Sequence, residues 1–145
     1  MSPTRADWKA DDSFVEGPKG VARVRAALKK HHLTVKDRVI TSRDPGMDDL
    51  RYTLRREDMP PGIKTWQIPF VMEGPAFFFL TVSEPGAVVP THEHQRDLFR
   101  IVISGSIITN GIELKSGDWM FVPKGVPYGY SAALNPGAVT YHCYG

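Results

Sequence analysis

Two histidines placed two positions apart are the residues of this sequence best suited to chemistry. His92 and His94 flank Glu93, and residues two apart on an extended strand point to the same side. We therefore expect the two imidazoles to face one point and Glu93 to point away from them. Such a pair presents two nitrogen donors to a metal ion, or supplies an acid and a base for proton transfer.

The spacing around this pair resembles the first motif of the cupin family. That motif is a Gly, five residues, His-x-His, three or four residues, a Glu, six residues and a Gly. Here Gly86, the histidine pair and Gly105 keep every spacing, but Leu98 stands where the Glu is expected. Asp97 is adjacent, and the alternation of a strand predicts that it faces the side opposite to Leu98.

A second segment resembles the second cupin motif. Gly117 is followed after five residues by Pro123-x-Gly125 and, after two more, by Tyr128, which replaces the family's His. The two motifs together cover roughly half of the chain. The resemblance implies an all-β fold, a cupin-type double-stranded β-helix (jelly-roll barrel) that is commonly dimeric and holds a metal ion through three His and one Glu.

The resemblance implies a divalent metal ion on His92 and His94, with Tyr128 as a further ligand. Two neutral imidazoles without a carboxylate make a weak site, more suited to Zn, Ni or Cu than to Fe. A phenolate from Tyr128 is costly at its ordinary pKa of about 10. A metal-free site is equally open, in which His94 or His92 is the base and Tyr128 the acid.

Arg100 has the same parity as Leu98, so we expect its side chain to enter the barrel. A buried guanidinium needs an anion or hydrogen-bond acceptors, and it can grip a carboxylate or phosphate ligand, with Tyr130 lining the same pocket. The alternative is an arginine near the barrel mouth that extends its charged end to water or pairs with an internal acid such as Glu84 or Glu113. The direction of His142, on the last predicted strand, stays open.

These residues predict a barrel that binds or acts on a small polar, anionic organic molecule, and they favour an enzyme. The enzyme would be a metal-dependent oxygenase, isomerase or lyase, or a metal-free epimerase or isomerase, with Tyr128 and His94 as catalytic groups. The alternative is a non-catalytic, metal-free binding or dimerisation module. The expected partners are the small ligand and a second copy of the chain.

The elements that position these residues are short strands separated by turn signals. Asn110-Gly111 is the strongest hairpin signal, because both turn positions need positive φ. Regularly spaced short strands favour a sandwich or barrel. The strands are predicted at residues 77–82, 88–94, 98–103, 106–109, 112–115, 119–122, 128–132 and 139–143, with a turn at Ser104-Gly105.

The N-terminal half is less regular. We expect a flexible tail at residues 1–20, a helix and arm packing on the barrel at 21–75, and the barrel at 76–145. Apolar residues at spacings of three and four predict a helix over 21–32. Residues 48–56 are ambiguous between helix and strand. Strand-like pieces at 39–41 and 66–70 are expected to add to the barrel sheet, in the same or a partner subunit.

Composition excludes several classes of protein. The 145 residues are 41% hydrophobic and 23% charged, with a net charge of +2, so a nucleic-acid partner is not expected. The single cysteine, Cys143, excludes an intrachain disulfide. The longest apolar run is far short of the ~20 residues of a membrane helix, and no signal-peptide pattern is seen. We expect a soluble, cytoplasmic protein.

Overall fold

The computed structural model describes Lys9, residues 16–72 and residues 76–145. Over these residues the chain forms two compact units. The barrel unit comprises residues 35–44, 72 and 76–145, and the helical unit comprises Lys9 with residues 16–34 and 45–71. The barrel unit therefore takes in a short segment, 35–44, from the N-terminal half of the chain.

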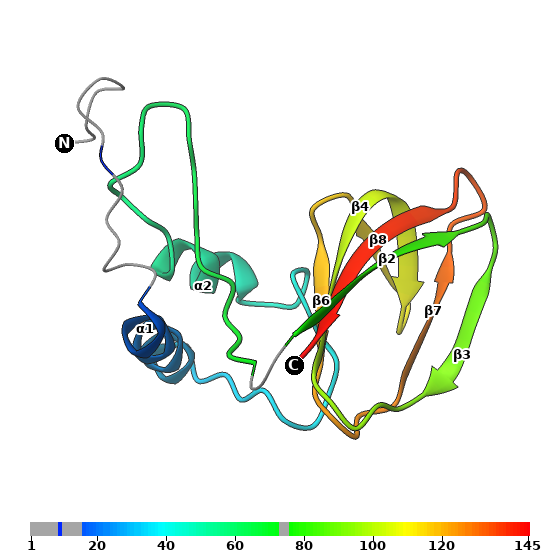
Figure 1. Cartoon of the computed structure of the whole chain (residues 1–145), viewed down its shortest axis with the longest axis horizontal. Coiled ribbons are helices and arrows are strands. Elements are labelled where there is room, and N and C mark those ends of the chain that lie inside the picture. Colours follow the sequence, from blue (N-terminus) through cyan, green and yellow to red (C-terminus); the bar gives the residue numbers. More distant parts are fainter. Residues whose placement is uncertain (1–8, 10–15, 73–75) are drawn as a thin grey trace. The chain divides into compact units, whose positions relative to one another are not determined.

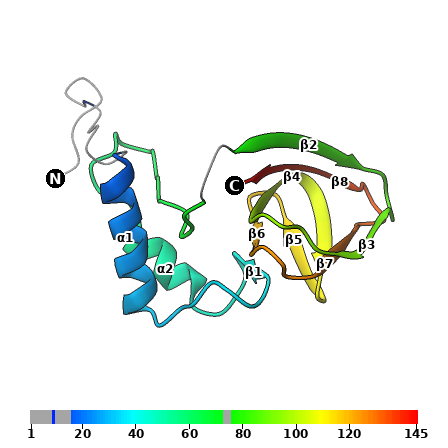
Figure 2. The ribbon, with the colours of Figure 1, turned by 60° about the horizontal axis from the view of Figure 1, so that its bottom comes forward.

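The barrel unit is an antiparallel barrel of two facing sheets (Figures 1 and 2). One sheet has the strand order β1-β6-β4-β8-β2 and the other has the order β5-β4-β7-β3. The strands of the described residues are β1 Ile40–Thr41, β2 Phe77–Ser83, β3 Val88–His92, β4 Leu98–Thr109, β5 Ile112–Lys115, β6 Trp119–Val122, β7 Tyr128–Ala132 and β8 Ala138–Tyr144. The all-β jelly-roll fold predicted from the sequence is confirmed.

Strand β4 belongs to both sheets. Its first part pairs with β6 and β8, and its last four residues pair with β5 and β7. The predicted turn at Ser104-Gly105 is wrong, because the strand continues through a register shift between Val102 and Ser104. Gly105 has φ +68°, and a Cβ there would overlap the carbonyl oxygen of Gly137. A glycine therefore lets β4 bend from one sheet into the other.

The core lies between the two sheets and follows the alternation of the strands. On β4, Leu98, Arg100 and Val102 are buried, whereas Phe99 and Ile101 are only half-buried. The core cluster contains residues from both sheets: Leu98, Val102, Ile107, Leu114, Met120, Val122, Tyr128, Tyr130, Ala132 and Ala138. The side chains of the sequence motifs therefore enter an apolar interior, where unpaired polar groups are costly.

Strand β1 extends the sheet at β6, so the predicted addition of residues 39–41 is confirmed. Ile40 pairs with Phe121, and the Asp118 carboxylate accepts hydrogen bonds from the Ser42 hydroxyl at 3.0 Å and the Arg43 side chain at 2.8 Å. The predicted strand at 66–70 is wrong. Trp66 forms only an isolated bridge with Arg55, since Pro69 removes a backbone donor from this segment.

The helical unit contains α1 (Gly17–Lys30) and α2 (Met47–Thr53) in its described residues. The predicted helix begins four residues earlier than expected, because Pro18 fits the first turn of a helix. The ambiguous segment at 48–56 is helical in its first part. The rest of the predicted tail, except Lys9 and Glu16, lies outside the described residues. Neither α1 nor α2 is long and apolar enough to cross a membrane.

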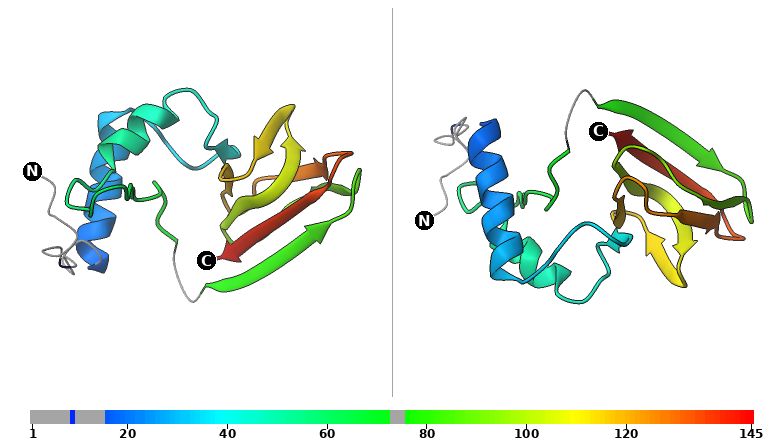
Figure 3. Two further views of the ribbon diagram at one scale, coloured as in Figure 1. Left: turned by 90° about the horizontal axis from the view of Figure 1, so that it is seen from above. Right: turned by 90° about the horizontal axis from the view of Figure 1, so that it is seen from below.

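Strand β2 lies at the edge of its sheet and pairs only with β8 among the described strands (Figure 3). Its apolar side chains are exposed. We call Phe78, Leu80, Val82 and Tyr141 the outer apolar face. On β2, Phe78 is 62% exposed, Leu80 63% and Val82 73%. Tyr141 on the neighbouring β8 is 40% exposed and stacks with Phe78. These side chains share one side of the sheet, since each of the β2 members pairs with an outward residue of β8.

Candidate functional site

The two histidines of the first motif lie at the end of β3 and point toward each other. His92 is the last residue of β3, and His94 follows two residues later in the loop. Their Nε2 atoms are 3.1 Å apart and their rings are perpendicular. The strand ends earlier than predicted, yet both imidazoles reach one point, as the His-x-His spacing suggested.

A backbone contact fixes the tautomer of His92. The Nδ1–H group of His92 donates to the carbonyl oxygen of Pro90 at 2.7 Å, so the neutral imidazole keeps a lone pair on Nε2. Without a metal ion, the Nε2–H group of His94 is then the donor in the contact between the two rings. This outer hydrogen bond is of the kind that orients histidine ligands in metal sites.

Two tyrosines complete the polar cluster around the histidines. Tyr128 lies opposite His92 in the pairing of β3 with β7, and its ring centroid is 4.6 Å from that of His92. The hydroxyl of Tyr144 is 3.4 Å from Nε2 of His94. Tyr144 was missed in the sequence; its parity with His142 on the last strand was the available signal.

The environment keeps these tyrosines protonated. Burial raises the pKa of Tyr128, while the positive charge of Arg100 acts in the opposite direction. Burial likewise raises the pKa of Tyr144. Both phenols are therefore hydrogen-bond donors near neutral pH, and the role of Tyr128 as a phenolate ligand becomes more costly than its residue type alone implies.

Arg100 is inside the barrel, 4% exposed. Its Nη1 donates to the Thr140 hydroxyl at 2.6 Å, and its guanidinium carbon lies 4.9 Å from the centroid of the Tyr130 ring. Its Nε is buried and has no hydrogen-bond partner in the described residues. Neither Glu84 nor Glu113, the pairing partners weighed from the sequence, lies in an ion pair with it, and both are exposed.

His142, whose direction the sequence left open, points into the barrel. It pairs with Arg100 across β4 and β8 and is 7% exposed. Burial, Arg100 and His94 lower the pKa of His142 to about 4. Burial, His92 and Arg100 also lower the pKa of His94. Both imidazoles are therefore neutral near pH 7 and able to accept a proton or bind a metal ion.

The donor set fits part of a metal site. Two ligand nitrogens about 2.0–2.1 Å from one Zn²⁺ ion lie roughly 3 Å apart, which matches the Nε2 atoms of His92 and His94. Among the described residues, no group of three or more His, Cys, Asp or Glu side chains is placed to hold an ion. The other positions would fall to water or a bound ligand.

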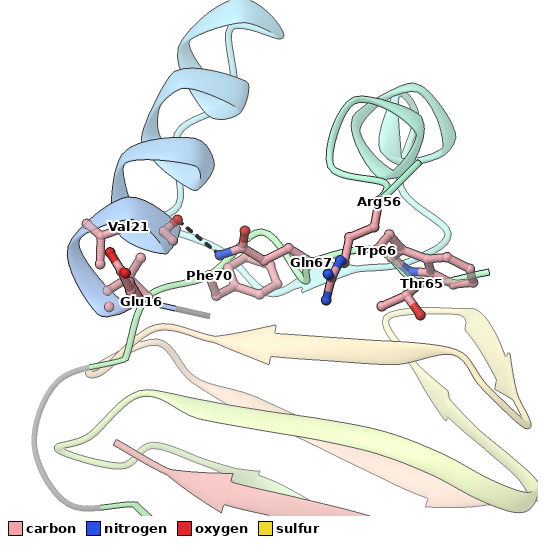
Figure 4. Close-up of a pocket in the computed structure, with 10 residues that line it drawn as sticks. Glu16, Val21, Arg56, Thr65, Trp66, Gln67 and Phe70 are labelled. Atoms are coloured by element: carbon pink, nitrogen blue, oxygen red, sulfur yellow. Dashed lines mark hydrogen bonds between the residues drawn. The ribbon is translucent and has the colours of Figure 1, made fainter. Parts of the chain in front are cut away.

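The helical unit has a pocket of its own, with a volume of about 400 Å³ (Figure 4). It lies between the first turn of α1 and the segment that follows α2. In it, the Gln67 side-chain amide donates to the Gly20 carbonyl at 3.0 Å, and Arg56 pairs with Asp58. None of the site residues predicted from the sequence lines this pocket.

Known proteins resemble this chain only in three-dimensional structure. No protein-family model matches the sequence, and no curated protein matches it either. The complex of SigE with the anti-sigma ChrR from Rhodobacter sphaeroides is 18% identical, with TM-score 0.46 over 50% of this chain and 40% of that chain. An RmlC-like cupin from Shewanella frigidimarina is 22% identical, with TM-score 0.42 over 48% and 64%.

A third similar structure is a cupin protein from Bacteroides fragilis. It is 19% identical, with TM-score 0.43 over 77% of this chain and 79% of that chain. The chain spans less than two thirds of the SigE–ChrR and Shewanella frigidimarina chains. At the identities of all three structures, only the fold is compared.

Proposed function

We propose that this barrel, which has the cupin fold, binds a small polar organic molecule at the cluster formed by His92, His94, Tyr128 and Tyr144. The observation that carries this proposal is the 3.1 Å separation of the two histidine Nε2 atoms, with the His92 tautomer held by Pro90. Four polar side chains meet at this point beside the apolar core cluster of the barrel, whose interior also holds Arg100, Thr140 and His142. Convergent polar groups in an apolar setting are typical of small-molecule sites.

The same pair of imidazoles is proposed to hold a divalent metal ion of the Zn, Ni or Cu type. A bound ion would supply Lewis-acid polarisation of an oxygen atom of the ligand. The protein's part is to present His92 Nε2 and His94 Nε2 at one point and to surround them with protonated phenols. Tyr128 and Tyr144 then donate hydrogen bonds to the ligand rather than charge to the ion.

Proton transfer is the chemistry that these side chains support by themselves. The lowered pKa of His94 keeps it neutral and able to take a proton. The raised pKa of Tyr128 keeps its hydroxyl protonated and able to give one. A ligand lying between the two is placed for isomerisation or epimerisation, with His94 as base and Tyr128 as acid.

Calorimetric titration of untagged protein with Zn²⁺, Ni²⁺ and Cu²⁺ tests the metal site. Wild type is expected to bind one ion with modest affinity, and His94→Ala is expected to lose most of that affinity. His32→Asn is the matched control, because His32 is exposed in the helical unit and has a φ of 55°, which Asn tolerates. Equal binding by wild type and His94→Ala would show that the pair is not a metal site.

A non-catalytic dimerisation module is the second proposed function. It is supported by the outer apolar face, where Phe78, Leu80 and Val82 are each more than 60% exposed. Large exposed apolar patches mark interaction surfaces. A dimer that forms without metal and without turnover of any ligand would favour this function over an enzyme.

A further inference from the structure

Arg100 places a positive charge in the barrel without a negative partner in the described residues. Only 4% of its surface is exposed. The Thr140 hydroxyl, the face of Tyr130 and the protonated Tyr128 hydroxyl, which accepts a hydrogen bond from Arg100, are neutral contacts. The Nε–H group has no acceptor in the described residues. A buried charge of this kind is very unfavourable until an anion or a full set of acceptors meets it.

The described carboxylates of the barrel unit are either exposed or hydrogen-bonded to groups other than Arg100. Four of them are exposed: Asp37, Glu84, Glu93 and Glu113. Asp44 accepts from the Thr41 hydroxyl at 2.8 Å. Asp97 accepts from the backbone N–H group of Lys124 at 2.8 Å, and Asp118 is held by Ser42 and Arg43. The described acidic side chains of the barrel unit therefore leave the guanidinium to be neutralised by something that enters the barrel.

The pairing register adds a second observation, because the neighbours of Arg100 are neutral. Its partner on β6 is Met120 and its partner on β8 is His142, an imidazole that burial and Arg100 itself keep unprotonated. Leu98 lies two residues earlier on the same face, at the position where the first cupin motif has its Glu. The described interior thus has a positive charge at position 100 and no negative charge at position 98, where the motif has its Glu.

We propose that the ligand of this barrel carries a carboxylate or similar planar monoanionic group and that Arg100 is its counter-ion. This rests on the proposed function in taking the barrel interior as the ligand site. A single guanidinium balances one negative charge, and its planar array of donors matches a carboxylate. The ligand then supplies the negative charge that Leu98 does not, both to Arg100 and to a cation on His92 and His94.

The Arg100 Nε–H resonance gives a direct test in ¹⁵N-labelled protein. Acetate and benzoate are the probes, and acetamide and benzamide are their uncharged controls of nearly the same shape. We expect the two carboxylates to shift this resonance saturably. The two amides should bind at least about tenfold more weakly, because hydrogen bonds to charged groups contribute about 1.5–3 kcal/mol. Equal responses to acids and amides would overturn the proposal.

Variants at position 100 separate charge from shape. Arg100→Met is expected to weaken benzoate binding roughly 10- to 100-fold, and Arg100→Lys is expected to recover part of it because the charge returns without the planar array. Arg96→Met, which removes an exposed arginine from the loop after His94, is expected to bind as wild type. Thermal unfolding without ligand checks that each variant folds.

Metal titration with and without benzoate distinguishes failure of this inference from failure of the proposed function. We expect benzoate to tighten Zn²⁺ binding by about tenfold or more, in the range usual for coupling between sites, and Arg100→Met to bind Zn²⁺ without needing the anion. Zn²⁺ binding through His94 that benzoate does not affect would overturn the coupling and leave the metal proposal intact. Benzoate binding through Arg100 without any Zn²⁺ binding would support the anion site and refute the metal site.

Discussion

Phe79 on β2 and His142 on β8 lie opposite each other in the sheet register, and their rings stack with centroids 5.2 Å apart. The Thr81 hydroxyl approaches Nδ1 of the same imidazole at 3.5 Å. This stack covers a histidine whose pKa is lowered to about 4, first by burial and then by Arg100 and His94. The edge strand β2 therefore takes part in keeping the His142 imidazole uncharged.

We expect the stability of the protein to fall as the pH drops from about 6.5 to about 4. The pKa of His142 in the folded state lies below the ordinary value of 6.5. Between pH 6.5 and about 4 the unfolded state therefore binds a proton that the folded state does not, and the free energy of unfolding decreases. A shift of this size corresponds to at most about 3 kcal/mol. Urea unfolding at several pH values measures it.

The matched variant for this prediction is His142→Phe, which keeps an aromatic ring against Phe79 and removes the titration. Its free energy of unfolding should change less between pH 6.5 and 4 than that of wild type. His32→Asn, at an exposed position, is the control for removing a histidine outside the barrel. A wild-type stability that is flat over this range would contradict the prediction.

Leu98→Glu should tighten metal binding by restoring the carboxylate of the motif. Leu98 is fully buried on the inner face of β4, so the new carboxylate is directed inward, and it would neutralise part of the charge of the ion. Calorimetry with Zn²⁺ compares the variant with wild type, with Leu98→Gln as the uncharged control. Affinity should also fall at acidic pH, since protonated imidazole does not bind metal. Because the pKa of His94 is lowered, its part in this loss comes below the ordinary value of 6.5.

The competing outcome for Leu98→Glu is capture of the new carboxylate by Arg100, two residues away on the same face. In that case Zn²⁺ affinity would not rise, and benzoate would no longer shift the Arg100 Nε–H resonance. Unchanged Zn²⁺ affinity together with unchanged benzoate binding would mean that residue 98 does not reach the cluster.

Leu80→Glu should dissociate the homodimer that we expect from the outer apolar face. Each large apolar side chain buried at an interface contributes about 1.5–3 kcal/mol, and a carboxylate in its place would be desolvated without a partner. Light scattering at high micromolar concentration should give a dimer for wild type and a monomer for the variant. Lys124→Glu, in an exposed turn, is the control for added negative charge.

Wild-type protein that is monomeric at this concentration would rule out the dimer. A dimer that persists in Leu80→Glu would instead show that another surface joins the two copies.

Gly105→Ala should destabilise the barrel by several kcal/mol. The substitution combines a positive φ of 68° with an overlap between the new Cβ and the carbonyl oxygen of Gly137. Gly111→Ala is the matched control, because Gly111 has φ +75° but open space around its Cβ position. The control should lose only about 1 kcal/mol, the cost of the left-handed backbone, in the same thermal or urea unfolding experiment.

Local signals in the sequence were sufficient for most strands and for the inward direction of Leu98 and Arg100. Turn residues such as Asn110-Gly111 act on their neighbours, and the two-residue period of a strand is a local property. The continuity of β4 through Gly105 was missed, because a glycine at positive φ is compatible with a turn and with a bend in a strand.

These local signals do not predict which distant strands come into contact. The partnership of Tyr144 with His94 depends on the register between β8 and the end of β3, and the unpartnered Nε of Arg100 depends on which side chains surround it. Residues 66–70 have strand-like composition, yet composition does not specify a partner strand.

The short pairing of β1 with β6 has a consequence for dissecting the protein. The chain passes between the helical and barrel units at 34/35, 44/45 and 71/72, which are three crossings. No single proteolytic cut separates the two units into intact fragments. A fragment that begins at residue 76 leaves behind Ile40 and Thr41 and uncovers the Phe121 edge of β6, so a soluble recombinant barrel would need the 35–44 segment grafted or supplied as a peptide.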